Sequence, residues 1–113
     1  DFAQCLERVD NESFVYFDPP YRPISITASF TSYSKDAFDD REQKRLRKVY
    51  GELDKKDACV MLSNSDPKNV NPDDNFFDDL YRGYHIERLS ATRLINCNAE
   101  RRGFITEILV MNY

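Results

Sequence analysis

The apolar positions of this chain fall into short continuous runs and one long helical pattern. Phe14–Phe17 (FVYF) and residues 58–62 (ACVML) are too short for helices and rich in β-formers, which is typical of strands buried on both faces of a parallel sheet. Between them, apolar residues recur with the 3.6-residue period and predict a helix over residues 35–54, capped by Ser34.

The second half of the chain predicts another helix and two further strands. Asn71 as the cap, Pro72 at the first helical position and acids in the first turn indicate a helix that Gly83 ends. Residues 84–89 and Phe104–Met111 have strand patterns with no helix between them, which predicts an antiparallel hairpin. This order of elements is that of the second half of a doubly wound α/β sheet.

Composition narrows the class of protein. With 113 residues the chain forms one small domain at most. No apolar run is long enough for a membrane span and no leader is visible, so we expect a cytoplasmic protein with no membrane partner. Cys5, Cys59 and Cys97 lack metal or disulfide spacing and are expected to be reduced thiols, with Cys59 in the core. The net charge of -4 argues against nucleic-acid binding by electrostatics alone, so any DNA contact must be local or must depend on a missing part of the protein.

The first apolar run leads directly into Asp18, Pro19, Pro20 and Tyr21 (DPPY). Ligands of such sheets bind beyond the carboxyl ends of the strands, where Asp18 is the first residue. Two prolines stiffen the turn and remove amide donors, leaving the Asp18 carboxylate and the Pro19 carbonyl as acceptors. These acceptors suit both hydrogens of a planar amino group, such as that of adenine, and would aim its lone pair at an electrophile. Tyr21 offers a ring on which a flipped base can stack.

Simpler interpretations exist for each of these features. DPPY alone is also compatible with a proline-containing turn after a strand. Ser63 and Asn64 follow the second strand at the same sheet edge, but we favour ordinary turn chemistry for them. Arg93, Arg101 and Arg102 are expected either to contact DNA phosphates or to form a solvated hairpin loop. No residue is expected to bind a metal.

The chain resembles Dam-type (DpnII-type) DNA adenine methyltransferases. The motifs that carry the resemblance are FVYFDPPY, SNSD at residues 63–66, ATRLIN at residues 91–96 and RRGFITEILVMNY at the end of the chain, so it covers essentially the whole sequence. It implies methyl transfer from S-adenosyl-L-methionine to the adenine amino group in duplex DNA, and a Rossmann-like fold. The implied site comprises Asp18, Pro19, Pro20 and Tyr21 as catalytic residues, Asp18 and Phe17 at the cofactor, and Tyr33 and the three arginines at DNA.

The sequence also departs from that family. The family begins with a glycine-rich cofactor motif and a target-recognition region, whereas this chain has glycines only at 51, 83 and 103. We therefore expect residues 1–113 to be the C-terminal portion of the catalytic domain, inactive without an N-terminal half. The apolar edge at Phe14–Phe17 predicts self-association of the isolated chain.

Two other functions remain open at this point. The first is a non-catalytic interaction module that keeps the DPPY motif. The second is an amino-methyltransferase acting on RNA or on protein glutamine, because the DPPY geometry suits an amino group whatever polymer carries it.

Overall fold

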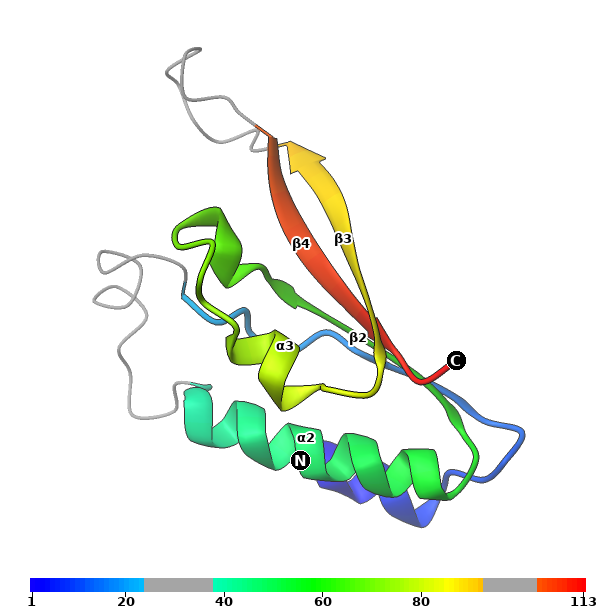
Figure 1. Cartoon of the computed structure of the whole chain (residues 1–113). Helices are drawn as coiled ribbons and strands as arrows, with labels where there is room; N and C mark the ends of the chain where they lie inside the picture. Colours follow the sequence, from blue (N-terminus) through cyan, green and yellow to red (C-terminus); the bar gives the residue numbers. More distant parts are fainter. Residues whose placement is uncertain (24–37, 93–103) are drawn as a thin grey trace.

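The computed structural model describes residues 1–23, 38–92 and 104–113, which form one mixed sheet with helices on one of its faces (Figure 1). The elements in chain order are the 3₁₀ helix η1 (Phe2–Glu7), β1 (Phe14–Phe17), α2 (Asp40–Lys55), β2 (Cys59–Ser65), the 3₁₀ helix η2 (Pro67–Asn69), α3 (Phe76–Leu80), β3 (His85–Thr92) and β4 (Phe104–Met111).

The four strands are ordered β1-β2-β4-β3. β1 pairs in parallel with β2, with Phe17 opposite Leu62. β4 is antiparallel to both of its neighbours and lies between β2 and β3, so the hairpin closes the sheet by inserting its second strand. The predicted parallel pair and the antiparallel hairpin are confirmed, and the fold is mixed α/β.

The helix α2 begins later than the sequence pattern predicts. Its cap is Asp39, whose carboxylate accepts a hydrogen bond of 3.0 Å from the Glu42 amide, and not Ser34. A cap must combine extended backbone with a side-chain acceptor, and Asp39 has both immediately before the first helical turn. Ser34 itself lies outside the described residues. The buried apolar face of α2 is as predicted and comprises Leu46, Val49, Tyr50 and Leu53.

The helix α3 is also shorter than predicted. Asn71 does not cap it, because its side chain accepts from the Asp73 amide at 3.0 Å within a preceding turn. The helix itself begins at Phe76, so Pro72 lies outside it. Phe77 is fully buried, and Gly83 adopts a φ of 96°, which is the left-handed conformation expected of a residue that follows a helix end.

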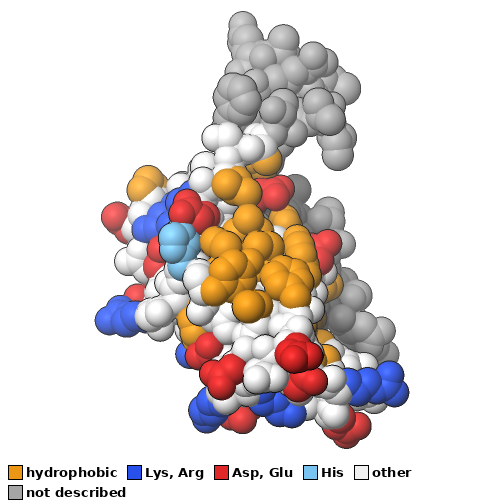
Figure 2. All heavy atoms as spheres, turned by 90° about the vertical axis from the view of Figure 1, so that its right-hand side faces the viewer, with side chains coloured by type: hydrophobic (Ala, Val, Ile, Leu, Met, Phe, Trp, Pro, Cys, Tyr) orange, Lys and Arg blue, Asp and Glu red, His pale blue; other side chains and the backbone are white. Residues whose placement is uncertain are grey.

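The two faces of the sheet differ strongly in burial. Every second side chain of a strand points to the face that carries the helices. On this face the core side chains are fully buried, among them Val60, Leu62, Ile108 and Val110. The alternate side chains of the same strands point to the opposite side of the sheet, where they form an apolar patch (Figure 2). We call this patch the outer face, and it comprises Phe14, Tyr16, Cys59, Met61, Leu109 and Met111.

The prediction that β1 is buried on both faces is therefore wrong for the described residues. Phe14 and Tyr16 are 57% and 50% exposed. Cys59, predicted to be in the core, is exposed for the same reason. Strand pleating sends alternate side chains to opposite faces, and a continuous apolar run does not say whether both faces are covered.

Thiols and acids in the described part of the chain form no metal site. Cys5 and Cys59 are free, and Cys97 lies outside the described residues. Among the described residues, no three His, Cys, Asp or Glu side chains gather closely enough to hold a metal ion. In those same ranges, no helix has the length and apolar character needed to cross a membrane.

Two buried tyrosines give a test of this packing. The Tyr50 hydroxyl donates to the Val60 carbonyl at 3.3 Å, whereas the Tyr81 hydroxyl is buried with no partner among the described residues. Because an unpaired buried hydroxyl is unfavourable, Tyr81→Phe should leave the free energy of unfolding unchanged or raise it by up to about 1 kcal/mol. Tyr50→Phe should lower it by about 1 kcal/mol. Urea denaturation checks both, and a larger loss for Tyr81→Phe than for Tyr50→Phe would contradict the packing.

Candidate active site

The DPPY residues lie at the carboxyl end of β1, beside an extension of β2. Phe17 pairs with Leu62, and β2 then continues for three more residues through Ser63, Asn64 and Ser65. The interpretation of Ser63 and Asn64 as turn residues is therefore wrong, because they pair in register with β4 and are buried. Their strand conformation places them alongside the DPPY loop.

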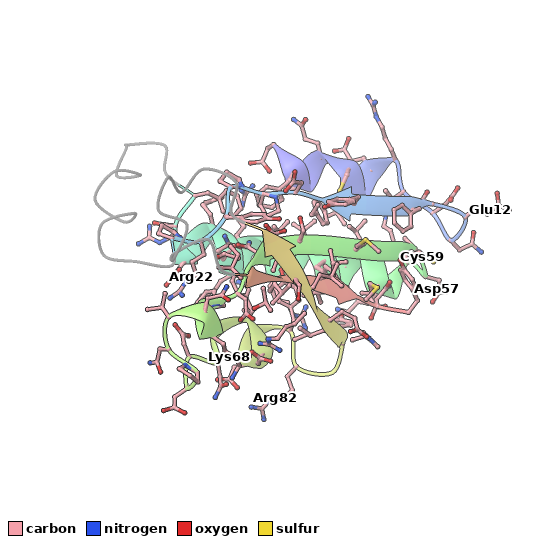
Figure 3. The ribbon with its side chains drawn as sticks, turned by 90° about the horizontal axis from the view of Figure 1, so that it is seen from above. Glu12, Arg22, Asp57, Cys59, Lys68 and Arg82 are labelled. Carbon is pink, nitrogen blue, oxygen red and sulfur yellow. The ribbon has the colours of Figure 1, made fainter. Side chains whose placement is uncertain are left out.

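Figure 3 shows which end of the sheet this is. Arg22, directly after the DPPY loop, lies at the opposite end of the β1–β2 pair from Glu12 and Cys59, which mark the amino ends of these strands. The predicted placement of Asp18 beyond the carboxyl end of β1 is confirmed by the strand bounds.

Two fully buried amides fasten the backbone of the loop. Gln43 of α2 donates from Nε2 to the Pro20 carbonyl at 3.3 Å, and Asn64 accepts from the Arg22 amide at 2.9 Å. The two amides also bond to each other, with Asn64 Nδ2 donating to Gln43 Oε1 at 3.2 Å. The Ser65 hydroxyl donates to the Arg22 carbonyl at 2.6 Å. The loop is thus tied to β2 and α2 on both sides of Tyr21.

The side chain of Arg22 continues this anchoring towards the helices. Its Nε donates to Asp40 at 2.8 Å, at the first residue of α2, and its guanidinium lies 4.2 Å from the centre of the Phe76 ring. The hydrogen bond from Arg22 to Asp40, more than any other contact, raises the pKa of the guanidinium although burial opposes it. The exit of the loop is therefore fixed to both α2 and α3.

The Asp18 carboxylate is exposed and held through one oxygen. Ser63 Oγ donates to Asp18 Oδ1 at 3.2 Å, and the Tyr16 hydroxyl donates to Ser63 Oγ at 2.9 Å. Within the described residues, no hydrogen bond reaches Asp18 Oδ2 or the Pro19 carbonyl oxygen. The two acceptors predicted to receive an amino group are both available in this part of the chain.

Tyr21 is the last residue of the DPPY motif and contacts β4. It is 39% exposed, and its hydroxyl donates to Glu107 Oε2 of β4 at 3.4 Å. Burial raises the pKa of the phenol, and the negative charges of Glu107 and Asp18 raise it further. The bond to Glu107 positions the ring on the outer side of the sheet, where solvent can reach it.

Other predicted site residues lie elsewhere. The Phe17 side chain is 9% exposed and packs in the core behind the loop, so the structure places it away from the open side of the site. Tyr33, Arg93, Arg101 and Arg102 lie outside the described residues.

Sequence analysis missed the residues that fasten the loop. Gln43 gave a usable signal, because it falls on the apolar face of the helix with Leu46, Tyr50 and Leu53, where a polar residue needs a buried partner. The sequence does place Asn64 at the same sheet edge, but asparagine is common in turns, and its burial depends on β2 continuing past β1.

A buried acidic residue supports the segment that follows β2. Asp66 is 1% exposed and accepts from Thr106 Oγ1 at 2.6 Å, from Arg88 Nε at 2.9 Å and from the Lys68 amide at 3.0 Å. Burial raises its pKa, but these hydrogen bonds outweigh burial and the pKa lies below its ordinary value. Asp66 thereby joins the end of β2 to both strands of the hairpin.

Comparison with known sequences gives the class of protein. Residues 1–95 match the family described as D12 class N6 adenine-specific DNA methyltransferase. Because the match covers most of the chain, the chain belongs to this family, and the resemblance inferred from the sequence motifs is confirmed.

Individual relatives agree with that family. The type II methyltransferase M.MjaIII of Methanocaldococcus jannaschii is 52% identical over 114 residues, which cover 100% of this chain and 37% of that protein. The type II methyltransferase M1.LlaDCHI of Lactococcus lactis is 41% identical, with the same coverage of 100% and 37%. The DNA adenine methylase of Haemophilus influenzae is 30% identical, covering 98% and 37%. The chain thus spans little more than a third of the length of these relatives.

The amide pair gives the first test of the site. Gln43→Ala should lower the free energy of unfolding by about 1–3 kcal/mol, because it leaves the buried Asn64 Nδ2 without its partner and removes the bond to the Pro20 carbonyl. Lys44→Ala, at the next and exposed position of the same helix, is the matched control and should have little effect. Urea denaturation measures both, and equal effects would contradict the role of Gln43.

Asp66 gives a test by pH. Its lowered pKa means that it stabilises the folded state above its ordinary pKa of 3.8, and this contribution is lost as the pH falls through the still lower folded pKa. The difference in free energy of unfolding between the wild type and Asp66→Asn should therefore be large at neutral pH and shrink at acid pH. The exposed Asp73→Asn is the control, and an Asp66→Asn difference that stays constant with pH would contradict the mechanism.

Proposed function

We propose that the complete protein transfers a methyl group from S-adenosyl-L-methionine to the exocyclic amino group of adenine in duplex DNA inside the cell. Residues 1–113 would be the C-terminal portion of its Rossmann-like catalytic domain, carrying the DPPY loop. Family membership supports the reaction, and coverage of 37% of the relatives supports a role for further sequence. The observation that carries the proposal is the exposed Asp18 carboxylate at the carboxyl end of β1, with Oδ1 held by Ser63 and Oδ2 directed to no described donor.

The arrangement suits catalysis by orientation of an amino group. The adenine amino nitrogen is a poor nucleophile because its lone pair is delocalised into the ring. Asp18 Oδ2 and the Pro19 carbonyl would each accept one amino hydrogen, which favours a more tetrahedral nitrogen and directs its lone pair out of the ring plane. The Tyr21 ring would stack on the base once it is flipped out of the duplex.

The cofactor would supply the electrophilic methyl group when bound. The donor set fits a positively charged sulfonium compound at this edge, since Asp18 and Glu107 both bring carboxylates and no described cation pairs with Asp18. Asp18 would lie at the methionine part of the cofactor. Phe17 would contribute through its backbone at the strand end, because its side chain belongs to the core.

The outer face suits contact with the rest of the catalytic domain. It is an apolar surface (Figure 2) that adjoins the site through Tyr16, and it is covered by no element of the described residues. Burying such a surface is strongly favourable. We propose that the additional sequence found in the relatives packs there, and that the isolated chain self-associates through the same surface.

The proposed DNA contacts lie outside the residues that the structure describes. Tyr33, Arg93, Arg101 and Arg102 remain the proposed DNA contacts. In the sequence, the arginines fall between β3 and β4, whose described parts pair from His85 to Thr92 and extend away from the helices (Figure 1). Arginine contacts to phosphates would add affinity without sequence information.

The proposal predicts the effect of removing one carboxylate. In the complete protein, Asp18→Ala should reduce methyl transfer to adenine in duplex DNA by about 100-fold or more, because it removes an acceptor that acts on the amino group in the transition state. Radiolabelled methyl incorporation measures this. Glu12→Ala, which removes an exposed carboxylate at the other end of β1, should leave the rate unchanged (Figure 3).

Two results would count against the proposal. Retained methyl transfer in Asp18→Ala would show that the loop is not the catalytic element. A wild-type protein that methylates RNA or glutamine in a peptide, but not duplex DNA, would assign the amino-methyltransferase chemistry to another polymer.

A further inference from the structure

Three polar side chains on the outer side of the sheet form a directed hydrogen-bond chain that ends on Asp18. The Tyr16 hydroxyl donates to Ser63 Oγ at 2.9 Å, and Ser63 Oγ donates to Asp18 Oδ1 at 3.2 Å. Tyr16 lies on β1 and Ser63 on β2, so the chain runs across the parallel strand pair.

The direction of this chain is fixed by the chemistry of its members. An ionised carboxylate can only accept, so the single hydrogen of Ser63 must point to Asp18. The Ser63 oxygen then has only acceptor positions left, and Tyr16 supplies the hydrogen for one of them. Ser63 is 3% exposed, so water has little access to replace either bond.

Tyr21, the other predicted catalytic side chain, has a different partner. Its hydroxyl donates to Glu107 Oε2 of β4 at 3.4 Å. The hydrogen of Ser63 is directed to Asp18 Oδ1 and not to this phenol.

We propose that Ser63 is a positioning residue for methyl transfer, with Tyr16 acting through it. This inference rests on the proposed function. A terminal carboxylate torsion is broad and roughly two-fold, so an unrestrained Asp18 would present either oxygen in many orientations. Occupying Oδ1 from one side reserves Oδ2 for the substrate and fixes the plane of the carboxylate. Tyr16 fixes the rotation of the Ser63 hydroxyl and so keeps its hydrogen on Asp18.

Kinetics of the complete protein test this assignment. Ser63→Ala should lower kcat for methylation of duplex DNA by roughly 10-fold to 100-fold with little change in KM for the cofactor, because orientation and not binding is lost. Ser63→Thr keeps the hydroxyl and should restore most of the rate. Tyr16→Phe should lower kcat by about threefold, since Ser63 can still bond to Asp18 in a fraction of its rotamers.

The double variant separates positioning from direct contact. If Tyr16 acts only through Ser63, adding Tyr16→Phe to Ser63→Ala should have no further effect on kcat. Tyr113→Phe is the matched control, because it removes an exposed tyrosine hydroxyl near Phe14 on the same face and should not change the rate. Thermal unfolding of each variant shows whether the fold is kept.

Each outcome decides one claim. A Ser63→Ala variant as active as the wild type would overturn the inference while leaving the proposed function intact. Additive effects of Tyr16→Phe and Ser63→Ala on kcat would show that Tyr16 acts independently of Ser63 and would overturn the claim that Tyr16 acts through Ser63. A wild-type complete protein that shows no methyl transfer to adenine in duplex DNA would instead remove the proposed function itself.

Discussion

The structure around the site depends on two buried amides that satisfy a backbone with few donors of its own. Pro19 and Pro20 have no N–H groups, so the chain leaving β1 cannot continue the ladder with β2. Its carbonyls and the next amide still need partners when they are buried. Gln43 donates to the Pro20 carbonyl and Asn64 accepts from the Arg22 amide, and because the two side chains also bond to each other they join the loop, β2 and α2 at one point. The prolines restrict the backbone angles of the loop, and the two amides fix its position relative to the sheet and the helix.

Strand parity separates the buried and the chemical roles of the same short segment. In β2, Asn64 points to the helices and fastens the loop backbone, whereas its neighbours Ser63 and Ser65 have the opposite parity. Ser63 therefore reaches Asp18, and Ser65 reaches the Arg22 carbonyl. A slip of one residue in register would exchange these roles, which explains why the pairing of β2 with β4 matters for the site.

Local patterns sufficed for most of the fold and for the position of Asp18. The apolar runs, the helical period of α2 and the hairpin were all predicted, because each depends on residues close in sequence. The errors arose where distant contacts decide. Ser63 and Asn64 have turn propensity, yet pairing with β4 holds them in a strand. Cys59 and Phe14 are apolar, yet no described element covers their face. Asp39 replaces Ser34 as the cap because it stands next to the first turn of α2.

Backbone and side chain of the proposed catalytic loop are held by different layers of the molecule. The position of the Pro19 carbonyl depends on the backbone that follows it. Gln43 holds that backbone at the Pro20 carbonyl, and Asn64 holds it at the Arg22 amide. The Asp18 carboxylate is placed by hydroxyl groups on the outer side of the sheet. Loss of a buried amide leaves unsatisfied groups in the core and acts on stability. Loss of a hydroxyl on the outer side of the sheet acts on the orientation of one carboxylate. The two acceptors proposed to grip a single amino group can therefore be perturbed separately, which is the physical basis for distinguishing a folding defect from a catalytic one at this site.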